Sequence, residues 1–495
     1  MHRCAALVLV CSTVAFTLLQ SGSAVEQIHI TLGDTDSEMR VLWATPSNVT
    51  SWVSYGTQRG DRLKRTQRSE NLRQGRRYFY RVYAEGSPVS RMYNFTTLPV
   101  HKNVSMTYLV YGDLGVRDGT DTFPALQAEL AHWNHTAVWH IGDEFLRLIE
   151  PVASSLPYMV SPGNHEIAGD FLHYRTRFST PGTPWPIPKG KMWYSYDIGL
   201  VHFISYSTEV YFTYNEEYEC SQYYWLLEDL VKANRNRARV PWIVAMGHRP
   251  MYCSNADADD CTGWLFGGRV RAGLENLFHT QGVDLIVEAH EHSYERLWPV
   301  YNYNVIQTNY VNPRGSVHVI SGAAGNQEGN DKFGPYSKAW SAYRHSKPRD
   351  NNFGRLHVHN RTHIHWQQVR VKDGHVFDSF WLVQHEHGPF VPNANCTLSV
   401  STHSSCHCPS PFYVLVLTYA AMFMACFAVI AVVAKLCWRW RMRIFGKCYV
   451  WGVLGQRPYL VYKTLSSKQI YEEEDATLIS ADEPSFFVGR AQGIQ

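Results

Sequence analysis

The chain has 495 residues, which is enough for two or three domains with a large buried core. Its 46 lysine and arginine residues nearly balance its 43 aspartate and glutamate residues, so the formal net charge is +3. This balance gives no support for nucleic-acid binding, which depends on a concentrated basic surface.

Two apolar segments predict a protein that is inserted in a membrane. Residues 1–24 have the pattern of a cleaved signal peptide, although an uncleaved anchor helix is the alternative. Residues 412–434 carry no charge and are long enough to cross a hydrocarbon core of about 30 Å. A basic cluster that begins at Lys435 follows them, so residues 435–495 are predicted to be a cytosolic tail. The chain is therefore predicted to be a type I membrane protein of the cell surface or endolysosomal system, with its larger part lumenal or extracellular.

The glycosylation sequons and cysteines agree with this topology. All the sequons precede the apolar segment, and their asparagines are Asn48, Asn94, Asn103, Asn134, Asn360 and Asn395. Cys253 and Cys261 flank a polar loop in the oxidising compartment and are the predicted disulfide pair, whereas the remaining pairing stays open. In the tail, Tyr462–Leu465 and Glu474–Ile479 resemble sorting signals that bind adaptors, although such short patterns also arise by chance.

Residues 25–99 alternate short strand patterns with polar turns. The predicted strands are Gln27–Leu32, Met39–Trp43, Ser51–Tyr55 and Tyr78–Tyr83. This pattern favours a small β-sandwich of the fibronectin type III or immunoglobulin kind. The polar stretch 57–75 is predicted to contain no strand, so the domain is short and is interpreted as incomplete.

Residues 106–384 alternate apolar strands with helices, which predicts a layered α/β or α+β fold. Strands are expected at 107–111, 138–141, 159–160, 203–206, 243–246, 285–287 and 317–320. Helices are expected at 126–133 and 223–234. A stalk at 393–411 then leads into the apolar segment.

Five short polar blocks follow these strands in one order along the chain. They are Gly112–Gly115, Gly142–Asp143, Gly163–Glu166, Gly247–Pro250 and Ala289–His292. Because each follows a buried strand, we expect their side chains to meet at the C-terminal edge of one sheet. Carboxylate, amide and imidazole groups at such an edge are the ligands of a dinuclear metal centre. A turn aspartate or a structural histidine explains any one block, but not five in this order.

The blocks resemble those of the metallophosphoesterase superfamily. Together with the preceding β-sandwich and the segments Tyr174–Phe178, Ser207–Val210 and Gly354–Asn360, they resemble the purple acid phosphatases, most closely the long animal forms called acid phosphatase type 7. The resemblance covers residues 25–384. It implies a metallophosphoesterase sandwich that hydrolyses small phosphate monoesters, with metal-bound hydroxide as the nucleophile.

The resemblance also implies the site residues. The metal ligands are Asp113, Asp143, Asn164, His248, His290 and His292, with His165 as the catalytic residue. Asp143 would bridge two ions, and His165 would contact the phosphate and protonate the leaving group. Fe(III) would be held by Asp113, Asp143, His292 and a tyrosinate. The other ion, Fe(II), Zn(II) or Mn(II), would be held by Asp143, Asn164, His248 and His290.

One departure from the family pattern is serious. The family's second block reads Gly-Asp-x-x-Tyr, whereas here Asp143 is followed by Glu144, Phe145 and Leu146. The tyrosine is missing, and the loop before Asn164 is shorter, as if a segment were absent through an unusual transcript or a gene-model error. The first metal site is therefore expected to be weakened, with Glu144 a substitute only if the loop turns it inward.

Two other functions remain open. One is hydrolysis of phosphodiesters or nucleotides within the same superfamily. The second is a catalytically inactive binding protein at the cell surface, which the lost tyrosine favours.

A histidine-rich stretch near residue 360 resembles a second metal site. His357, His359, His363 and His365 are paired at a spacing of two residues around Asn360. The alternation more simply predicts the two arms of a β-hairpin.

Overall fold

The computed structural model describes most of the chain before the apolar segment, together with one helix near the C-terminus. The described residues are 25–45, 47–59, 64–66, 72–99, 104–141, 146–213, 215–256, 261, 268–391, 408 and 419–437. The predicted signal peptide, most of the stalk, and the sorting patterns of the tail lie outside them. The chain divides into two units, 1–420 and 421–495.

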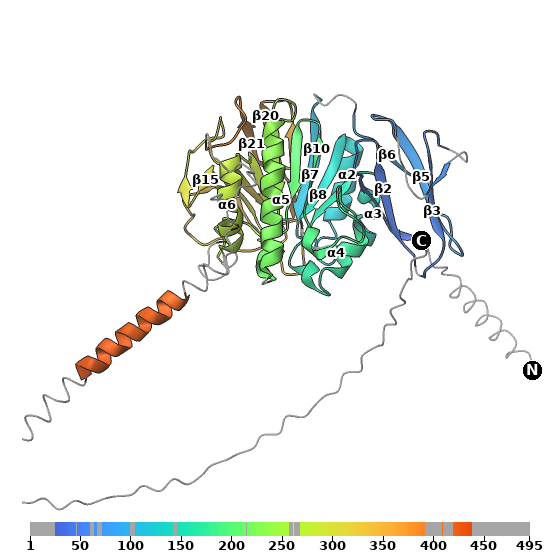
Figure 1. Cartoon of the computed structure of the whole chain (residues 1–495). Coiled ribbons are helices and arrows are strands. Elements are labelled where there is room, and N and C mark those ends of the chain that lie inside the picture. Colours follow the sequence, from blue (N-terminus) through green and yellow to red (C-terminus); the bar gives the residue numbers. More distant parts are fainter. Residues whose placement is uncertain are drawn as a thin grey trace, which may run out of the picture. The chain divides into compact units, whose positions relative to one another are not determined.

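Two mixed β-sheets form the first unit's main body (Figure 1). The six-stranded sheet has the order β21 (Val376–Val383), β20 (His363–Arg370), β19 (Asn352–Val358), β7 (Met106–Gly112), β8 (His135–Ile141), β9 (Tyr158–Ser161). The seven-stranded sheet has the order β10 (Tyr194–Ile198), β11 (Val201–Ser205), β12 (Trp242–Met246), β13 (Leu285–Glu288), β17 (Val317–Ser321), β14 (Tyr294–Leu297), β18 (Ser341–His345). A separate two-stranded hairpin pairs β15 (Val300–Tyr301) with β16 (Asn304–Val305). The strands that precede the polar blocks are parallel to one another within each sheet, namely β7, β8 and β9 in the six-stranded sheet and β12 and β13 in the seven-stranded sheet.

Helices cover the outer faces of both sheets. On the six-stranded sheet these are α2 (Thr122–His132), α3 (Leu146–Ala153) and α4 (Leu172–Arg177). On the seven-stranded sheet they are α5 (Glu216–Arg235) and α6 (Arg269–Gln281). Short 3-10 turns occur at η1 (His165–Ile167), η2 (Lys189–Lys191) and η3 (Glu209–Phe212). The result is the four-layered α/β sandwich expected from alternating strands and helices.

The main core lies between the two sheets. Val110 and Trp139 of the six-stranded sheet share one cluster with Phe203 and Val244 of the seven-stranded sheet. The rings of Trp139 and Phe203 are 4.4 Å apart between centroids. Every residue of β11 and β12 is buried, as expected for parallel strands that are covered on both faces.

The N-terminal strands form two smaller sheets. One pairs β1 (Glu26–Leu32) with β2 (Met39–Ala44). The other has the order β4 (Lys64–Thr66), β3 (Ser51–Gly56), β5 (Arg77–Ala84), β6 (Tyr93–Thr96). The prediction of a strand-free stretch at 57–75 is therefore wrong, because β4 pairs with β3 through the backbone of a polar segment that has no apolar alternation. The fibronectin-like assignment stays a prediction.

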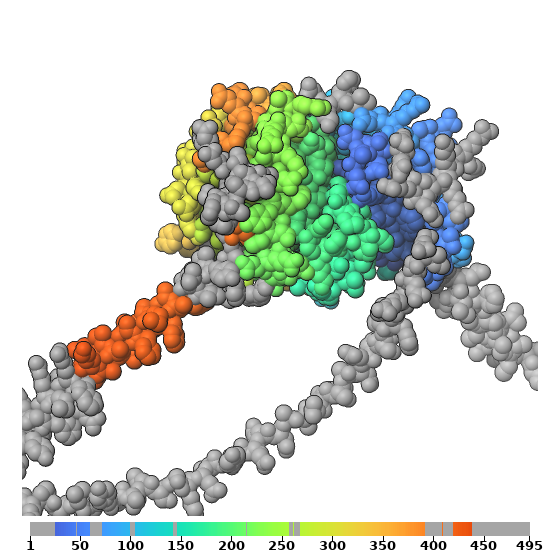
Figure 2. Space-filling view, in the orientation of Figure 1, coloured from blue at the N-terminus to red at the C-terminus, as the bar shows by residue number. Residues whose placement is uncertain are grey.

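These strands pack against the six-stranded sheet and its helices. Figure 2 shows the blue N-terminal strands against the teal segment that includes α3, and β1 contacts α3 directly. The Tyr80 hydroxyl donates to the Ser154 carbonyl oxygen at 2.7 Å, and the Tyr93 hydroxyl donates to Glu150 Oε1. The N-terminal strands thus support the face of the sheet that carries α3.

The described C-terminal helix spans Tyr419–Cys437 and is long and apolar enough to cross a membrane. It lies within and just beyond the predicted segment 412–434. This helix is consistent with a single membrane span, whereas the orientation stays a prediction.

Candidate metal centre

Each described block lies directly beyond the C-terminal end of its strand. Asp113 follows β7 and Asn164 follows β9, whereas His248 follows β12 and His290 follows β13. The expectation of one sheet edge is wrong, because β7 and β9 belong to the six-stranded sheet and β12 and β13 to the other. Apolar strand patterns look alike in both sheets, so they do not reveal which sheet a strand joins. The site lies where two sheet edges meet.

Two glycines allow the two edges to approach closely. A Cβ atom at Gly112, the last residue of β7, would lie 2.3 Å from the Cβ of Ala289, which follows β13. A Cβ atom at Gly322 would lie 2.3 Å from the carbonyl oxygen of Glu291 and 2.7 Å from Asp113 Oδ2. These distances are well below the optimal separation of about 3.5–4.0 Å between carbon atoms. A side chain at either glycine would push the two edges apart.

Asn164, His248 and His290 bring three donor atoms together. Asn164 Oδ1 lies 2.7 Å from His248 Nε2 and 3.2 Å from His290 Nδ1, and the two ring nitrogens are 3.1 Å apart. Ligands at right angles around an ion, with bonds of about 2.1 Å, are about 3.0 Å apart. The three atoms therefore fit one face of a coordination shell. Imidazole nitrogen and amide oxygen suit Zn²⁺, Fe²⁺ or Mn²⁺.

The surroundings of His248 favour the neutral ring that binds metals. Its side chain is fully buried, and burial, followed by the positive charge of His290 and Arg249, holds the pKa of His248 well below the usual 6.5. Nδ1 lies 3.4 Å from the carbonyl oxygen of Ile141, a contact that directs Nε2 toward Asn164. Contacts of this kind orient histidine ligands in metal sites.

Asp113 joins the two sheet edges through its carboxylate. Its side chain is buried, and Oδ2 accepts the backbone N–H of His290 at 2.7 Å. Asp113 and His290 have φ values of +53° and +67°. Non-glycine residues in this region each cost of the order of 1–3 kcal/mol, and they cluster at functional sites. The two turns are therefore held in place by the structure around them.

Arg249 contacts His290 from the side away from Asn164. Its Nη1 lies 3.1 Å from His290 Nε2, and its Nε donates to Glu209 Oε1 at 3.0 Å. Both Arg249 and Glu209 are buried. Arg249 belongs to the block Gly247–Pro250, but sequence reasoning assigned it no role because its partner, Glu209, lies in a separate segment.

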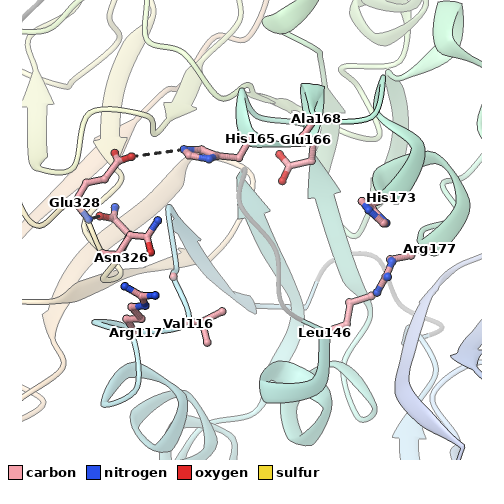
Figure 3. Close-up of a pocket in the computed structure, with 12 residues that line it drawn as sticks. Val116, Arg117, Leu146, His165, Glu166, Ala168, His173, Arg177, Asn326 and Glu328 are labelled. Carbon is pink, nitrogen blue, oxygen red and sulfur yellow. Dashed lines mark hydrogen bonds and ion pairs between the residues drawn. The ribbon is translucent and has the colours of Figure 1, made fainter. Parts of the chain in front are cut away.

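His292 and His165 lie on either side of Glu328. The carboxylate of Glu328 is 3.8 Å from His292 Nδ1 and 4.0 Å from His165 Nε2. Burial lowers the pKa of His292 to about 4, whereas the side chain of His165 is 49% exposed. Figure 3 shows His165 and Glu328 facing each other at the edge of a pocket. Sequence reasoning missed Glu328, although it lies in the segment that follows β17 of the seven-stranded sheet.

The pocket next to His165 has a volume of about 480 Å³. Its lining includes His165, Glu328 and His173 as well as two arginines, Arg117 and Arg177. In Figure 3 His173 and Arg177 lie on the wall opposite Glu328. The pocket therefore places basic side chains beside the exposed imidazole of His165, together with the carboxylates of Glu166 and Glu328 and an apolar part of its wall.

Part of the predicted site lies outside the described residues. The segment 142–145 contains Asp143, the predicted bridging ligand. It also contains Glu144, the candidate substitute for the missing tyrosine. Their roles stay predictions. The described chain resumes at Leu146, which lines the pocket.

The disulfides and sequons are placed as follows. Cys253 and Cys261 are joined, and a second disulfide links Cys220 of α5 to Cys408 of the stalk. The sulfur atoms of the first pair lie near the carboxylate of Glu291, a grouping that resembles a metal site but is explained by the disulfide. The sequon asparagines within the described residues are exposed, namely Asn48, Asn94, Asn134 and Asn360. Glycosylation stays a prediction, and Asn103 and Asn395 lie outside the described residues.

Comparisons with known proteins agree with this geometry. The family model of the calcineurin-like phosphoesterases matches residues 106–294, and that of the iron/zinc purple acid phosphatase-like protein C matches residues 315–379. The chain is 40% identical to acid phosphatase type 7 of Homo sapiens, over 76% of this chain and 95% of the human protein. It is 29% identical to purple acid phosphatase 22 of Arabidopsis thaliana, over 73% of this chain and 86% of the plant protein.

A solved structure shows the same fold. Purple acid phosphatase PPD1 from yellow lupin (Lupinus luteus) seeds matches with a TM-score of 0.63 at 22% identity, over 73% of this chain and 75% of the lupin chain. This likeness concerns the fold, whereas the identity to the human protein concerns the sequence over nearly its whole length. The chain belongs to the purple acid phosphatases, a family of acid phosphatases with a dinuclear metal centre.

Proposed function

We propose that this chain hydrolyses small phosphate monoesters at the edge where its two sheets meet. The observation that carries the proposal is the convergence of Asn164 Oδ1, His248 Nε2 and His290 Nδ1 within 3.2 Å of one another. These residues would hold a divalent ion together with Asp143. Asp113 and His292, again with Asp143, would hold an iron ion. Bound ions would supply Lewis-acid stabilisation of the phosphoryl charge and activation of water.

The chain's own side chains supply proton donation and substrate binding. His165 is half exposed beside the pocket, so its imidazole can reach a substrate oxygen without being a metal ligand. Protonated His165 donates a proton to the leaving alcohol, and the carboxylate of Glu328 lies 4.0 Å from its Nε2. The requirement for a protonated imidazole gives the reaction an acidic optimum. The pocket receives the alcohol part of the substrate.

The missing tyrosine makes this chain a poor phosphatase as written. A tyrosinate is an anionic oxygen donor suited to a hard trivalent ion, and its loss leaves a coordination position open. The iron site therefore binds its ion weakly. An inactive binding protein is the second candidate, and the missing tyrosine is the specific observation that favours it.

The membrane topology belongs to the same proposal. The helix Tyr419–Cys437 crosses the membrane once, and the part of the chain before it lies in the lumen or outside the cell. Its partners there are small phosphorylated substrates. A C-terminal epitope should be detected only after the cells are permeabilised, and glycosidase treatment of intact cells should lower the protein's mass. An epitope that is accessible on intact cells would contradict this topology.

The activity is tested with the full chain, purified in detergent and loaded with Fe and Zn. Phosphate release from p-nitrophenyl phosphate near pH 5 is compared with release from bis(p-nitrophenyl) phosphate, and the His248→Ala variant is the control. We expect slow monoester hydrolysis that the variant abolishes. Preferred cleavage of the diester would favour a phosphodiesterase, and release equal to that of the variant would favour the inactive binding protein.

A further inference from the structure

The predicted hairpin forms, and its histidines share one face of the six-stranded sheet. His357 lies directly opposite His365 in the register of β19 and β20. The backbone N–H of His359 donates to the carbonyl oxygen of His363 at 3.0 Å, which continues the same pairing. Trp381 of β21 lies opposite His365. Because side chains alternate along strands, all five side chains project from the face opposite the main core.

Three of these rings form a nearly equilateral triangle, which we call the histidine face: His357, His359 and His365. The distances between their ring centroids are 6.0, 5.9 and 6.1 Å. The centre of such a triangle is about 3.5 Å from each centroid. An imidazole bound at about 2.0–2.1 Å has its centroid about 3.2 Å from the ion. The spacing of the centroids therefore suits one ion, provided that the rings turn a nitrogen toward the centre of the triangle.

The rings of the histidine face are available as ligands. Within the described residues, no hydrogen bond to a ring nitrogen of His359 or His365 occurs; both rings instead lie against Trp381, at 4.8 and 4.4 Å between centroids. Both ring nitrogens of His357 have partners, since Nδ1 lies 2.9 Å from Thr107 Oγ1 and Nε2 lies 3.1 Å from Gln367 Oε1. An ion bound by His357 therefore replaces one of these two side-chain contacts. Burial lowers the pKa of His357 to about 4 and also lowers that of His365.

We propose that the histidine face binds one divalent transition-metal ion of the class that imidazoles prefer, Cu²⁺ or Zn²⁺. His359 and His365 are its first ligands, and His357 completes the set. The nearest nitrogens of the three rings do not all lie within 4.8 Å of one another, so binding includes rotation about χ2, a soft torsion in histidine. Water fills the remaining positions on this exposed surface.

The site is separate from the candidate metal centre. His357 pairs with Thr107 near the start of β7, whereas Asp113 follows the opposite end of the same strand. The proposal therefore does not rest on the phosphatase activity. The hairpin reading of the sequence is correct, but strand alternation alone does not reveal that both arms point their histidines to one face at matching positions.

The test measures bound copper on the full chain in detergent. The protein is dialysed against Cu²⁺ alone at a low fixed concentration, and the copper content is determined by elemental analysis. The parent is compared with the double variant His359→Gln/His365→Gln and with a matched control, His132→Gln/His375→Gln, whose histidines are exposed elsewhere. We expect the double variant to bind one equivalent less than the parent and the control, with affinity for that equivalent weakened at least about tenfold.

A second measurement uses Trp381, whose ring stacks on His365. Cu²⁺ quenches the fluorescence of nearby tryptophans, so the Trp381→Phe variant should lose a component of the quenching while it binds the same amount of copper. Equal copper content in the parent and the double variant would overturn the proposal. Quenching that is unchanged in the Trp381→Phe variant would overturn it as well.

Discussion

The two halves of the candidate metal centre differ in how completely the described residues build them. The imidazole half consists of Asn164, His248 and His290, whose donor atoms lie within 3.2 Å of one another. The carboxylate half consists of Asp113 and His292. Its proposed third ligand, Asp143, lies outside the described residues, and the family's tyrosine is absent from the sequence. Strand ends position the three donors of the imidazole half, whereas the carboxylate half also needs a tyrosine that this sequence lacks.

The physical consequence is a difference in metal affinity. The imidazole half offers neutral donors that suit a divalent ion, and Ile141 and Arg249 hold its histidines in place. The carboxylate half is proposed to hold a trivalent iron ion, which would require anionic ligands. Loss of one anionic ligand therefore harms the carboxylate half far more than it harms the imidazole half.

The largest effect is expected from removal of the bridging carboxylate, which would break both halves together. Asp143→Ala should lose both ions, because this residue is proposed to be the ligand that the halves share. His165→Ala is the matched control, since His165 is not a ligand and its variant should keep both ions while losing activity. The metal content of the two purified variants is measured by elemental analysis. Equal metal loss in both would contradict the assigned roles.

Restoring the missing loop would repair the carboxylate half alone. A variant with a family-like Gly-Asp-x-x-Tyr loop in place of residues 142–146 should bind a full equivalent of iron, show the tyrosinate–iron colour and release phosphate faster. If the tyrosine contributes 3 kcal/mol to transition-state stabilisation, the rate gain is over about a hundredfold. The control has the same loop with Phe in place of Tyr. Full activity and colour in the unaltered chain would mean that another tyrosine reaches the iron.

Much of this centre could be predicted from the sequence, because each ligand motif follows an apolar strand. The residues Asp113, Asn164, His248 and His290 were found in this way, and the structure brings them together. Such motifs are local, so a short stretch of sequence contains both the strand and the turn after it. The same locality explains why the central strands and the helix α2 were located within a few residues, whereas α5 begins at Glu216, before the expected start at residue 223.

Features that depend on contacts between distant segments could not be predicted. The pairing order that divides the strands between two sheets is one, and the disulfide between Cys220 and Cys408 is another. Glu328 was missed because it lies in no motif, whereas Glu209 lies in the segment Ser207–Val210 but was given no role. Each gains its role only through a partner elsewhere in the chain. The hydrogen-bonded strand β4 was missed because backbone pairing needs no apolar alternation.

A milder change should weaken the imidazole half while leaving the carboxylate half intact. Arg249→Lys keeps the positive charge beside the buried Glu209, but a lysine cannot contact both Glu209 and His290 as the guanidinium does. Loss of such an orienting contact typically weakens metal binding by about 10- to 100-fold. Zn²⁺ affinity is measured by competition with a chelator, with the exposed Arg361→Lys as the control. Affinity equal to that of the control would show that Arg249 does not position His290.

The smallest effect concerns the loss of folding stability in acid that arises from β8, the strand that precedes Asp143. His140 lies on β8, is buried, and has its Nδ1 2.9 Å from the Tyr158 hydroxyl. Burial lowers the pKa of His140 from 6.5 to about 3. The unfolded chain therefore takes up this proton first as the pH falls, so stability is lost from about pH 6.5 downward.

Between pH 7 and pH 4.5 the loss from this one group is about 2–3 kcal/mol. In His140→Leu the penalty is absent, and Tyr158 still accepts the hydroxyl proton of Tyr111. The free energy of unfolding of this variant should therefore fall less than that of the parent when the pH is lowered from 7 to 4.5, as urea denaturation would show. His375→Leu, at an exposed position, should behave as the parent does. If the parent and His140→Leu showed the same pH dependence, the stability of β8 would not depend on this proton. The weakness of the carboxylate half would then be attributed to the missing tyrosine alone.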